Sequence, residues 1–311
     1  MRGKVLIAAP VHDVLTKGLA AEGYELVVVE NITQDLAFKF ISNCVGVITS
    51  TRLQLNKDLL DAAPLLQWIG RMGSGMEVID VEYAIQKGIQ CFSSPEGNCN
   101  AVAEHALGLL LGLTKKIVSS NEEVRQGKWL REENRGMELE GKTIGIIGFG
   151  HTGTAFAKKL SGFDMHILAY DKYKRDLSFS GIEFCKDLNR IFKEADIISF
   201  HVPLQEDTLH YFNDFFLNQM QKPFILLNTS RGQVVDTNVI LLGLKGGKLR
   251  AVGLDVLEEE PLSKTSIIYQ EKIKEIQAYT QVIITPHIAG YSHEALYKMS
   301  KTLLTKIVTR M

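Results

Sequence analysis

The stretch "TIGIIGFGHTG", residues 143–153, constrains the fold of this 311-residue chain more than any other. Gly148, Gly150 and Gly153 follow an apolar run and precede the helical pattern "TAFAKKLSGF". In such a loop the first glycine permits a tight turn, the second lets a pyrophosphate approach the backbone, and the third lets the helix pack closely on the strand. The helix N-terminus has unpaired N–H groups that suit a phosphate. The stretch therefore predicts a strand–loop–helix unit that binds a dinucleotide.

A carboxylate follows the next strand-like run, "HILAYD", at Asp171. This is close to the position at which an acidic side chain hydrogen-bonds the adenosine ribose of a bound dinucleotide. A carboxylate there would repel a 2′-phosphate, so Asp171 favours NAD over NADP. The positive charges of the nearby Lys172, Lys174 and Arg175 weaken this preference without reversing it.

Short β-branched runs alternate with amphipathic stretches along the chain, which is typical of parallel sheets covered by helices on both faces. Five runs precede residue 98: "VLIAAP", "LVVV", "VGVITS", "LQWIGRM" and "IQCFSS". Seven follow "GKW": "TIGIIGFG", "HILAYD", "IEFC", "IISFHV", "FILLNT", "AVGLDV" and "VIITPHI". The predicted fold is α/β, with two Rossmann-like or flavodoxin-like doubly wound parallel-sheet domains and a cleft between them.

Between the two series, "NCNAVAEHALGLLLGLTKKI", residues 98–117, predicts a long buried helix that joins the domains. The residues after "TPHIAG" suffice for one helix that returns to pack on the first domain. We therefore expect one domain at 1–98 plus 289–311 and another at 99–288, and no regulatory domain after them.

Composition excludes several classes of function. A formal net charge of −1 offers no field for a polyanion, so nucleic acid is not an expected partner. The chain has no apolar run near the roughly 18 residues that a membrane span needs. Its four cysteines form no CxxC pair and no zinc-like spacing with histidine. These features predict a cytoplasmic protein that binds neither membranes nor metals.

Polar residues follow three apolar runs of the second series. Arg231 ends "FILLNTSR", a group of acids follows "GLDV", and His287 lies in "VIITPHIAG". The carboxyl ends of parallel strands meet at the edge where ligands bind. A guanidinium can grip a carboxylate with two hydrogen bonds, and histidine exchanges protons near neutral pH. Beside a dinucleotide loop, this set suits oxidation of a hydroxy acid, although three consecutive acids by themselves usually face water.

The chain resembles the D-isomer-specific 2-hydroxyacid dehydrogenases over nearly its whole length. The matching stretches are "GRMGSGMEVID", "NAVAEHALGLLLGL", "GKTIGIIGFGHTG", "HVPL", "LNTSRGQVVD", "GLDVLEEEPL" and "TPHIAG". The resemblance implies that Arg231 orients the substrate, that His287 is the general acid/base and that Glu260 pairs with this histidine. Glu258 and Glu259 are then expected to be solvated.

The resemblance also assigns the binding residues, with NAD as the cofactor. It implies cofactor contacts beyond Asp171 for Gly148, Gly150, His151, Thr152, Gly153, Val202, Thr229, Ser230, Asp255 and Gly290. Asp255 would contact the nicotinamide carboxamide, and Ser74 with Gly75 would receive the substrate carboxylate. A homodimer that pairs through the cofactor domain, in part through residues 101–113, is also implied.

Within this family the stretches around Arg71 and Arg131 look most like those of phosphoglycerate dehydrogenases, which oxidise 3-phosphoglycerate to 3-phosphohydroxypyruvate in serine biosynthesis. Both arginines stand where those enzymes bind their substrate. The chain departs from them at Ser50-Thr51-Arg52, where the basic residue that those enzymes have just after the third strand is displaced or missing. Glyoxylate or hydroxypyruvate reductase and D-lactate dehydrogenase stay open as alternatives, as does a corepressor-like interaction protein that senses NAD.

Overall fold

The computed structural model describes residues 2–29, 31–174 and 179–309. The chain divides into two units, Met1–Ala101 with Gly290–Met311, and Val102–Ala289. The first boundary falls inside the long helix α5, Pro95–Thr114. Both boundaries lie within three residues of those expected from the sequence.

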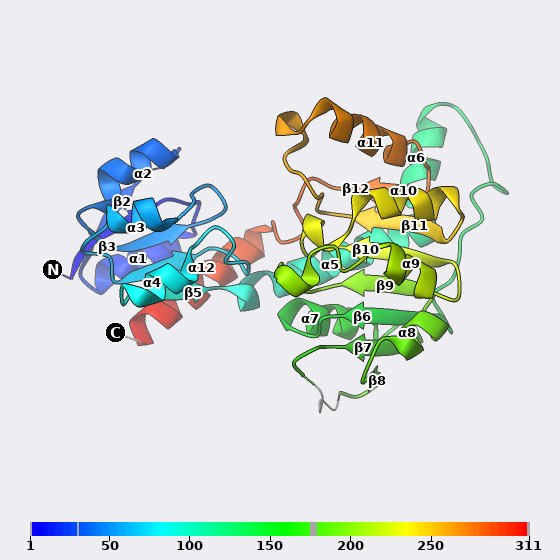
Figure 1. Ribbon diagram of the computed structural model, residues 1–311, viewed down its shortest axis with the longest axis horizontal. Coiled ribbons are helices and arrows are strands. Elements are labelled where there is room, and N and C mark those ends of the chain that lie inside the picture. The colour runs from blue at the N-terminus through cyan, green and yellow to red at the C-terminus, as the bar shows by residue number, and fades with distance from the viewer. Residues whose placement is uncertain (1, 30, 175–178, 310–311) are drawn as a thin grey trace. The chain divides into compact units, whose positions relative to one another are not determined.

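The first unit, drawn in blue to cyan with its last helix in red in Figure 1, is built on a five-stranded parallel sheet. The strand order is β2-β1-β3-β4-β5. The strands are β1 (Gly3–Ile7), β2 (Tyr24–Val28), β3 (Cys44–Thr49), β4 (Trp68–Arg71) and β5 (Gln90–Ser93). The helices are α1 (Asp13–Ala21), α2 (Gln34–Ile41), α3 (Lys57–Asp61), α4 (Val81–Gln86) and α12 (His293–Thr309). This is the flavodoxin-like order, so the predicted class of this domain is confirmed.

Each face of this sheet has its own apolar core. Leu15 and Leu19 of α1 pack with Leu303 and Ile307 of α12 on one face. On the other face, α2, α3 and α4 bury residues such as Ile41 against β1 and β3. The last helix therefore returns to the first sheet, as its sequence predicted.

The second unit is built on a seven-stranded parallel sheet with strand order β12-β11-β10-β9-β6-β7-β8. The strands are β6 (Thr143–Ile147), β7 (His166–Tyr170), β8 (Ile182–Phe184), β9 (Ile197–Phe200), β10 (Phe224–Asn228), β11 (Leu249–Leu254) and β12 (Val282–Ile284). Besides α5, the helices are α6 (Ile117–Arg125), α7 (His151–Leu160), α8 (Asn189–Glu194), α9 (Asp214–Gln219), α10 (Thr237–Lys245) and α11 (Ile267–Gln277). The strand order reverses between β6 and β9, which is the doubly wound dinucleotide-binding topology.

Helices cover both faces of this sheet. One core joins the sheet to α8, α9, α10 and α11, and the other joins it to α5 and α7. Helix α5 buries Ala103, Ala106 and Leu110 completely, while Glu104 is exposed. The helix ends near Lys116, whose φ of 52° is left-handed and interrupts the helical backbone. It is therefore shorter at its C-terminal end than the sequence indicated.

Candidate active site

The glycine loop joins β6 directly to α7, as its sequence predicted. Gly148 has a φ of 91°, and a Cβ atom there would lie 2.5 Å from the His201 carbonyl oxygen. A Cβ at Gly153 would lie 2.1 Å from the Gly148 carbonyl oxygen, so helix and loop could not pack as they do. Gly150 is the N-cap residue, and among the described residues no side chain caps α7. The first amides of α7, at His151 and Thr152, are therefore left for an anion.

Asp171, just after β7, ties this loop to the next strand. Its carboxylate accepts hydrogen bonds from the Phe149 amide at 2.8 Å, the Tyr173 amide at 2.9 Å and the Lys174 amide at 3.1 Å. The Lys174 ammonium donates to the Phe149 carbonyl at 3.0 Å. The structure thus places the predicted ribose carboxylate against the glycine loop, while Arg175 lies outside the described residues.

The loop after β9 brings a buried histidine close to the glycines. His201 lies 2.8 Å from the Ser199 hydroxyl, and burial lowers the pKa of this histidine to about 3. His201 is therefore neutral near pH 7. Val202, the next residue, lies beside the glycine loop, because a Cβ at Gly148 would meet its Cγ1 at 2.9 Å.

The loop after β10 is held by Asn228, a buried residue that the sequence analysis missed. Its side-chain oxygen accepts from the Ser230 amide at 3.0 Å and the Ser230 hydroxyl at 2.7 Å. Its side-chain amide donates to the Arg231 carbonyl at 2.8 Å. An asparagine at the end of an apolar strand is the available sequence signal, because asparagine commonly bonds the turn that follows it.

Two predicted residues occupy this loop with different surroundings. Arg231 is partly buried, and its Nη1 donates to the Ser230 carbonyl at 2.6 Å. Thr229 is 8% exposed, and within the described residues its buried hydroxyl has no hydrogen-bond partner. A buried hydroxyl usually has a partner, so Thr229 is suited to a ligand contact.

Gly232 joins this loop to the loop after β11. A Cβ at Gly232 would lie 1.7 Å from the Leu257 carbonyl oxygen, a separation that no side chain can adopt. The backbone that carries Arg231 therefore packs directly on the backbone that leads to the three glutamates.

The three glutamates have three different environments. Glu259 is exposed, as predicted. The prediction that Glu258 is solvated is wrong, because Glu258 accepts from His210 Nε2 at 2.7 Å, the Thr237 amide at 3.0 Å and the Thr237 hydroxyl at 2.6 Å. Partial burial opposes ionisation of Glu258, but the hydrogen bonds from Thr237 and His210 outweigh it and lower its pKa. Its partners lie far away in sequence, which is why the run alone did not reveal them.

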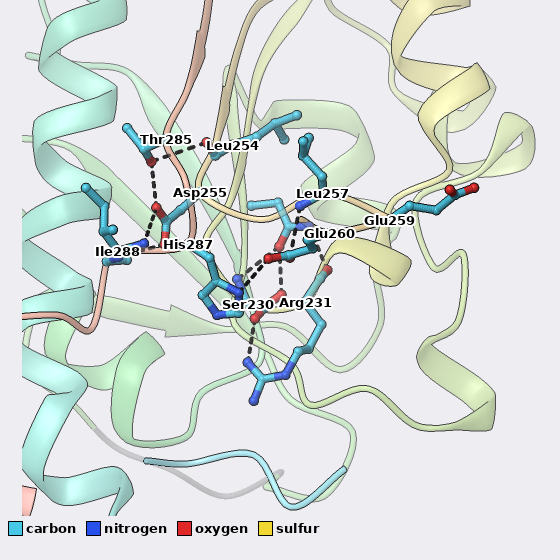
Figure 2. Close-up of polar contacts among 12 residues, drawn as sticks. Ser230, Arg231, Leu254, Asp255, Leu257, Glu259, Glu260, Thr285, His287 and Ile288 are labelled. Atoms are coloured by element: carbon cyan, nitrogen blue, oxygen red, sulfur yellow. Dashed lines mark hydrogen bonds and ion pairs between the residues drawn. The ribbon is translucent and has the colours of Figure 1, made fainter. Parts of the chain in front are cut away.

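Glu260 and His287 meet across the two loops that follow β11 and β12 (Figure 2). His287 Nδ1 lies 2.8 Å from Glu260 Oε2, and Oε1 of the same carboxylate accepts from the Leu257 amide at 3.2 Å. An ionised carboxylate only accepts hydrogen bonds, so Nδ1 carries the proton and neutral His287 keeps the lone pair on Nε2. The side chains are 45% and 31% exposed, so the pair is open to a substrate.

His287 has a left-handed backbone, with a φ of 57°, that its neighbours stabilise. Its amide donates to the Asp255 carbonyl at 2.7 Å. The Asp255 carboxylate, 1% exposed, accepts from the Thr285 hydroxyl at 2.6 Å, the Ile288 amide at 2.9 Å and the Ala289 amide at 2.7 Å. Asp255, predicted to contact the nicotinamide, is thus directed at the loop that carries His287 (Figure 2).

The first unit holds four residues predicted to bind substrate or cofactor. Arg71 is only 8% exposed, and its Nη1 donates to the Met72 carbonyl at 2.7 Å. Its guanidinium lies against Gly73, where a Cβ would meet Nη1 at 1.5 Å. Ser74 and Gly75 follow and are partly buried, and Gly290 packs on Asn98. Arg71 therefore supports the loop that presents Ser74 and Gly75.

Arg131 belongs to the second unit. It lies in the turn segment between α6 and β6 and is exposed. No described hydrogen bond or ion pair joins it to Arg231, Glu260 or His287. Among the described residues there is also no group of three or more histidine, cysteine, aspartate or glutamate side chains that could hold a metal ion. The same part of the chain contains no helix of the length and hydrophobicity that a membrane crossing requires.

Comparison with known proteins identifies a family model for residues 107–289, described as "D-isomer specific 2-hydroxyacid dehydrogenase, NAD binding domain". The D-3-phosphoglycerate dehydrogenase of Methanocaldococcus jannaschii is 33% identical over 310 residues, which are 99% of this chain and 57% of that protein. The chain thus spans little more than half the length of this relative.

Two further similar proteins match over most of both chains. The hydroxypyruvate reductase of Thermotoga maritima is 34% identical over 278 residues, covering 89% of this chain and 88% of that one. The solved D-lactate dehydrogenase of Aquifex aeolicus, in complex with NAD and lactic acid, superposes with a TM-score of 0.85 at 28% identity, covering 99% of this chain and 96% of that one.

Proposed function

Because this chain belongs to the D-isomer-specific 2-hydroxyacid dehydrogenase family, we propose that it interconverts a D-2-hydroxy acid and its 2-oxo acid with NAD. The observation that carries the proposal is the 2.8 Å contact between His287 Nδ1 and Glu260 Oε2. This contact leaves Nε2 of neutral His287 as an acceptor on an accessible ring. Gly232 links the Glu260 loop to the Arg231 loop, so the three proposed catalytic residues come from adjoining loops.

The residues of the second unit fit the dinucleotide. The close backbone contacts at Gly148 and Gly153, the uncapped start of α7 and the buried Thr229 hydroxyl all suit a bound NAD molecule. When bound, NAD supplies the hydride acceptor. Asp171 would accept hydrogen bonds from the ribose, in addition to those it accepts from the protein backbone.

The proposed chemistry divides between three side chains. Arg231 would bind the carboxylate of the acid with its planar guanidinium. His287 Nε2 would take the hydroxyl proton during oxidation and return it during reduction. Glu260 would hold the imidazole in the correct tautomer and stabilise the imidazolium that forms. The attraction between Glu260 and His287 strengthens as His287 takes up the proton, because the imidazole ring then becomes positively charged.

3-Phosphoglycerate is the first substrate candidate, and serine biosynthesis would be its role. The support is the likeness to a phosphoglycerate dehydrogenase and the exposed cation at Arg131. A specific observation favours hydroxypyruvate or glyoxylate instead. The Arg71 guanidinium is largely buried against Gly73 and the Met72 carbonyl, so it offers a phosphate little accessible charge.

We further propose a homodimer that pairs through the second unit. Several apolar side chains are exposed on α6 and just after it: Ile117, Val118, Val124 and Trp129. Exposed apolar groups of this size commonly mark a protein interface. A cytoplasmic location is consistent with four free cysteines, none of which forms a disulfide within the described residues.

The test is to assay the purified protein with a panel of acids and to measure turnover by the absorbance of NADH. 3-Phosphoglycerate would be offered with NAD, and phosphohydroxypyruvate, hydroxypyruvate, glyoxylate and pyruvate with NADH. We expect turnover of at least one acid, and the kcat/KM ranking separates the two candidates. NADH binding without turnover of any of these acids would contradict the dehydrogenase proposal and support an NAD-sensing interaction protein.

A further inference from the structure

His105 contacts the buried Asp255 system from a different element, helix α5. Its Nε2 lies 2.9 Å from the Thr285 hydroxyl and 3.4 Å from Asp255 Oδ1. The side chain is 22% exposed, whereas the Asp255 side chain is 1% exposed. The sequence alone does not reveal a role for His105, because Thr285 and Asp255 lie far from it along the chain.

The close approach of α5 to β11 explains this contact. A Cβ at Gly253 would lie 3.3 Å from the Cβ of Leu109, so the absence of a side chain at Gly253 lets the helix pack against the strand. Leu109 lies one helical turn after His105, on the same face of α5. The packing therefore brings His105 to the end of the strand, where Asp255 begins the loop.

The hydrogen bonds fix which atoms donate. The Thr285 hydroxyl has one proton, and its 2.6 Å distance to Asp255 Oδ1 is typical of a bond to a carboxylate. The hydroxyl must then accept from His105, so His105 carries a proton on Nε2. The chain of donors runs from His105 to Thr285 to Asp255.

Asp255 in turn determines the position of His287. Its carboxylate binds the amides of Ile288 and Ala289, and its carbonyl binds the amide of His287. These bonds hold the left-handed backbone of His287, and with it the ring that faces Glu260. Any loosening of Asp255 would change the direction of that ring.

We propose that His105 is a positioning residue: through Thr285 and Asp255 it holds the loop of residues 285–289 so that His287 stays aligned with Glu260. The inference rests on the proposed function for its kinetic consequence. The effect on the loop itself is independent of any activity. No described hydrogen bond or ion pair joins His105 to Glu260 or His287, so its influence runs through the side chains of Thr285 and Asp255 to the backbone of the loop.

The test uses four variants of the full chain. His105→Phe removes the donor, and His105→Gln keeps an N–H near the position of Nε2. Thr285→Val removes the bridging hydroxyl with little change in shape. Glu104→Gln is the matched control on the same helix, where it weakens the ion pair with Lys159 and leaves His105 in place. Hydrogen exchange of the peptide that covers residues 285–290 is measured first, and then kcat, KM and NADH affinity.

We expect His105→Phe and Thr285→Val each to speed exchange in that peptide about tenfold and to lower kcat by a similar factor, the effect of one lost hydrogen bond to a charged network. KM and NADH affinity should change less than twofold, and His105→Gln and Glu104→Gln should behave like the wild type. Unchanged exchange in Thr285→Val, or equal effects of His105→Phe and His105→Gln, would overturn the proposal. If the wild type turns over no acid, the proposed function fails, and the exchange result still decides the role of His105.

Discussion

His287 is the residue at which the proposed chemistry can be tested most directly. Its ring is accessible, is paired with one carboxylate and lies outside the glycine loop. We expect His287→Ala to lower kcat by about 10²–10⁴-fold, because the proton would no longer have an acceptor. NADH affinity should be nearly unchanged. Stopped-flow turnover and fluorescence titration with NADH would measure the two quantities.

A matched control is His166→Ala, which removes an exposed histidine at the start of β7 in the same unit. It should leave kcat at the wild-type value. Equal losses in the two variants, or full activity in His287→Ala, would remove His287 from the mechanism.

At the level of single residues, the sequence predicted the positions whose role depends on residues close to them in the same motif. The contacts at Gly148 and Gly153 follow a local pattern, whereas the pairing of His287 with Glu260 was implied by the family resemblance. Glu258 and His105 could not be predicted, because their environments are made by residues distant in sequence. Arg71 shows a third case: the sequence predicts a substrate contact but not that the guanidinium is largely buried beside Gly73 and the Met72 carbonyl.

Among the elements, the loop between β11 and η3 (Leu262–Lys264) depends on Glu258 as its anchor. Glu258 bonds His210 and the start of α10 while Glu260, two residues later, faces His287. A carboxylate whose pKa is lower in the folded protein stabilises the fold above its unfolded pKa and loses this effect as the pH falls through the folded pKa. The pKa of Glu258 is lowered from 4.5 in the folded protein. The stabilisation by its ionised carboxylate should therefore be complete near neutral pH and should be lost as the pH falls from 4.5 through the lower folded pKa.

We therefore expect Glu258→Gln to lower the free energy of unfolding by about 1–3 kcal/mol near neutral pH. The difference in free energy of unfolding between Glu258→Gln and the wild type should become smaller as the pH falls below 4.5. Urea denaturation near neutral pH and below pH 4.5 would measure this difference, with Glu259→Gln at the exposed neighbouring position as the control. A gap that stays constant with pH would show that the charge of Glu258 does not stabilise this loop.

The strands could be predicted because their short apolar runs are bounded by glycine or polar residues, and α5, α7 and α12 could be predicted from the stretches beside those runs. The end of α5 could not, since a left-handed residue at Lys116 stops the helix where the sequence pattern continues. Parallel strands buried on both faces give a strong signal from hydrophobicity alone. A single backbone conformation at a lysine gives none.

For the whole molecule, the homodimer is the testable expectation. Val118 is 54% exposed on α6, and Ile85 is 65% exposed on α4 of the first unit. Sedimentation velocity should show a species with twice the mass of one chain. Val118→Glu should dissociate it, because a charge would be buried without a partner in the interface. Ile85→Glu, the control, should leave the dimer intact. A dimeric Val118→Glu variant would place the interface elsewhere, and a monomeric wild type would contradict the dimer itself.

The missing side chain at Gly232 has a consequence for how such an enzyme can be redesigned. Its backbone packs so close to the Leu257 carbonyl that a Cβ would not fit, so the arginine loop and the glutamate loop are packed against each other. A redesign for a larger or smaller substrate that moves Arg231 would therefore also displace the loop of Glu260. The alignment of Glu260 with His287 would then be lost. Changes in substrate specificity should therefore be sought by varying other segments, such as the one around Arg131, while residues 228–232 and 255–260 are left unchanged.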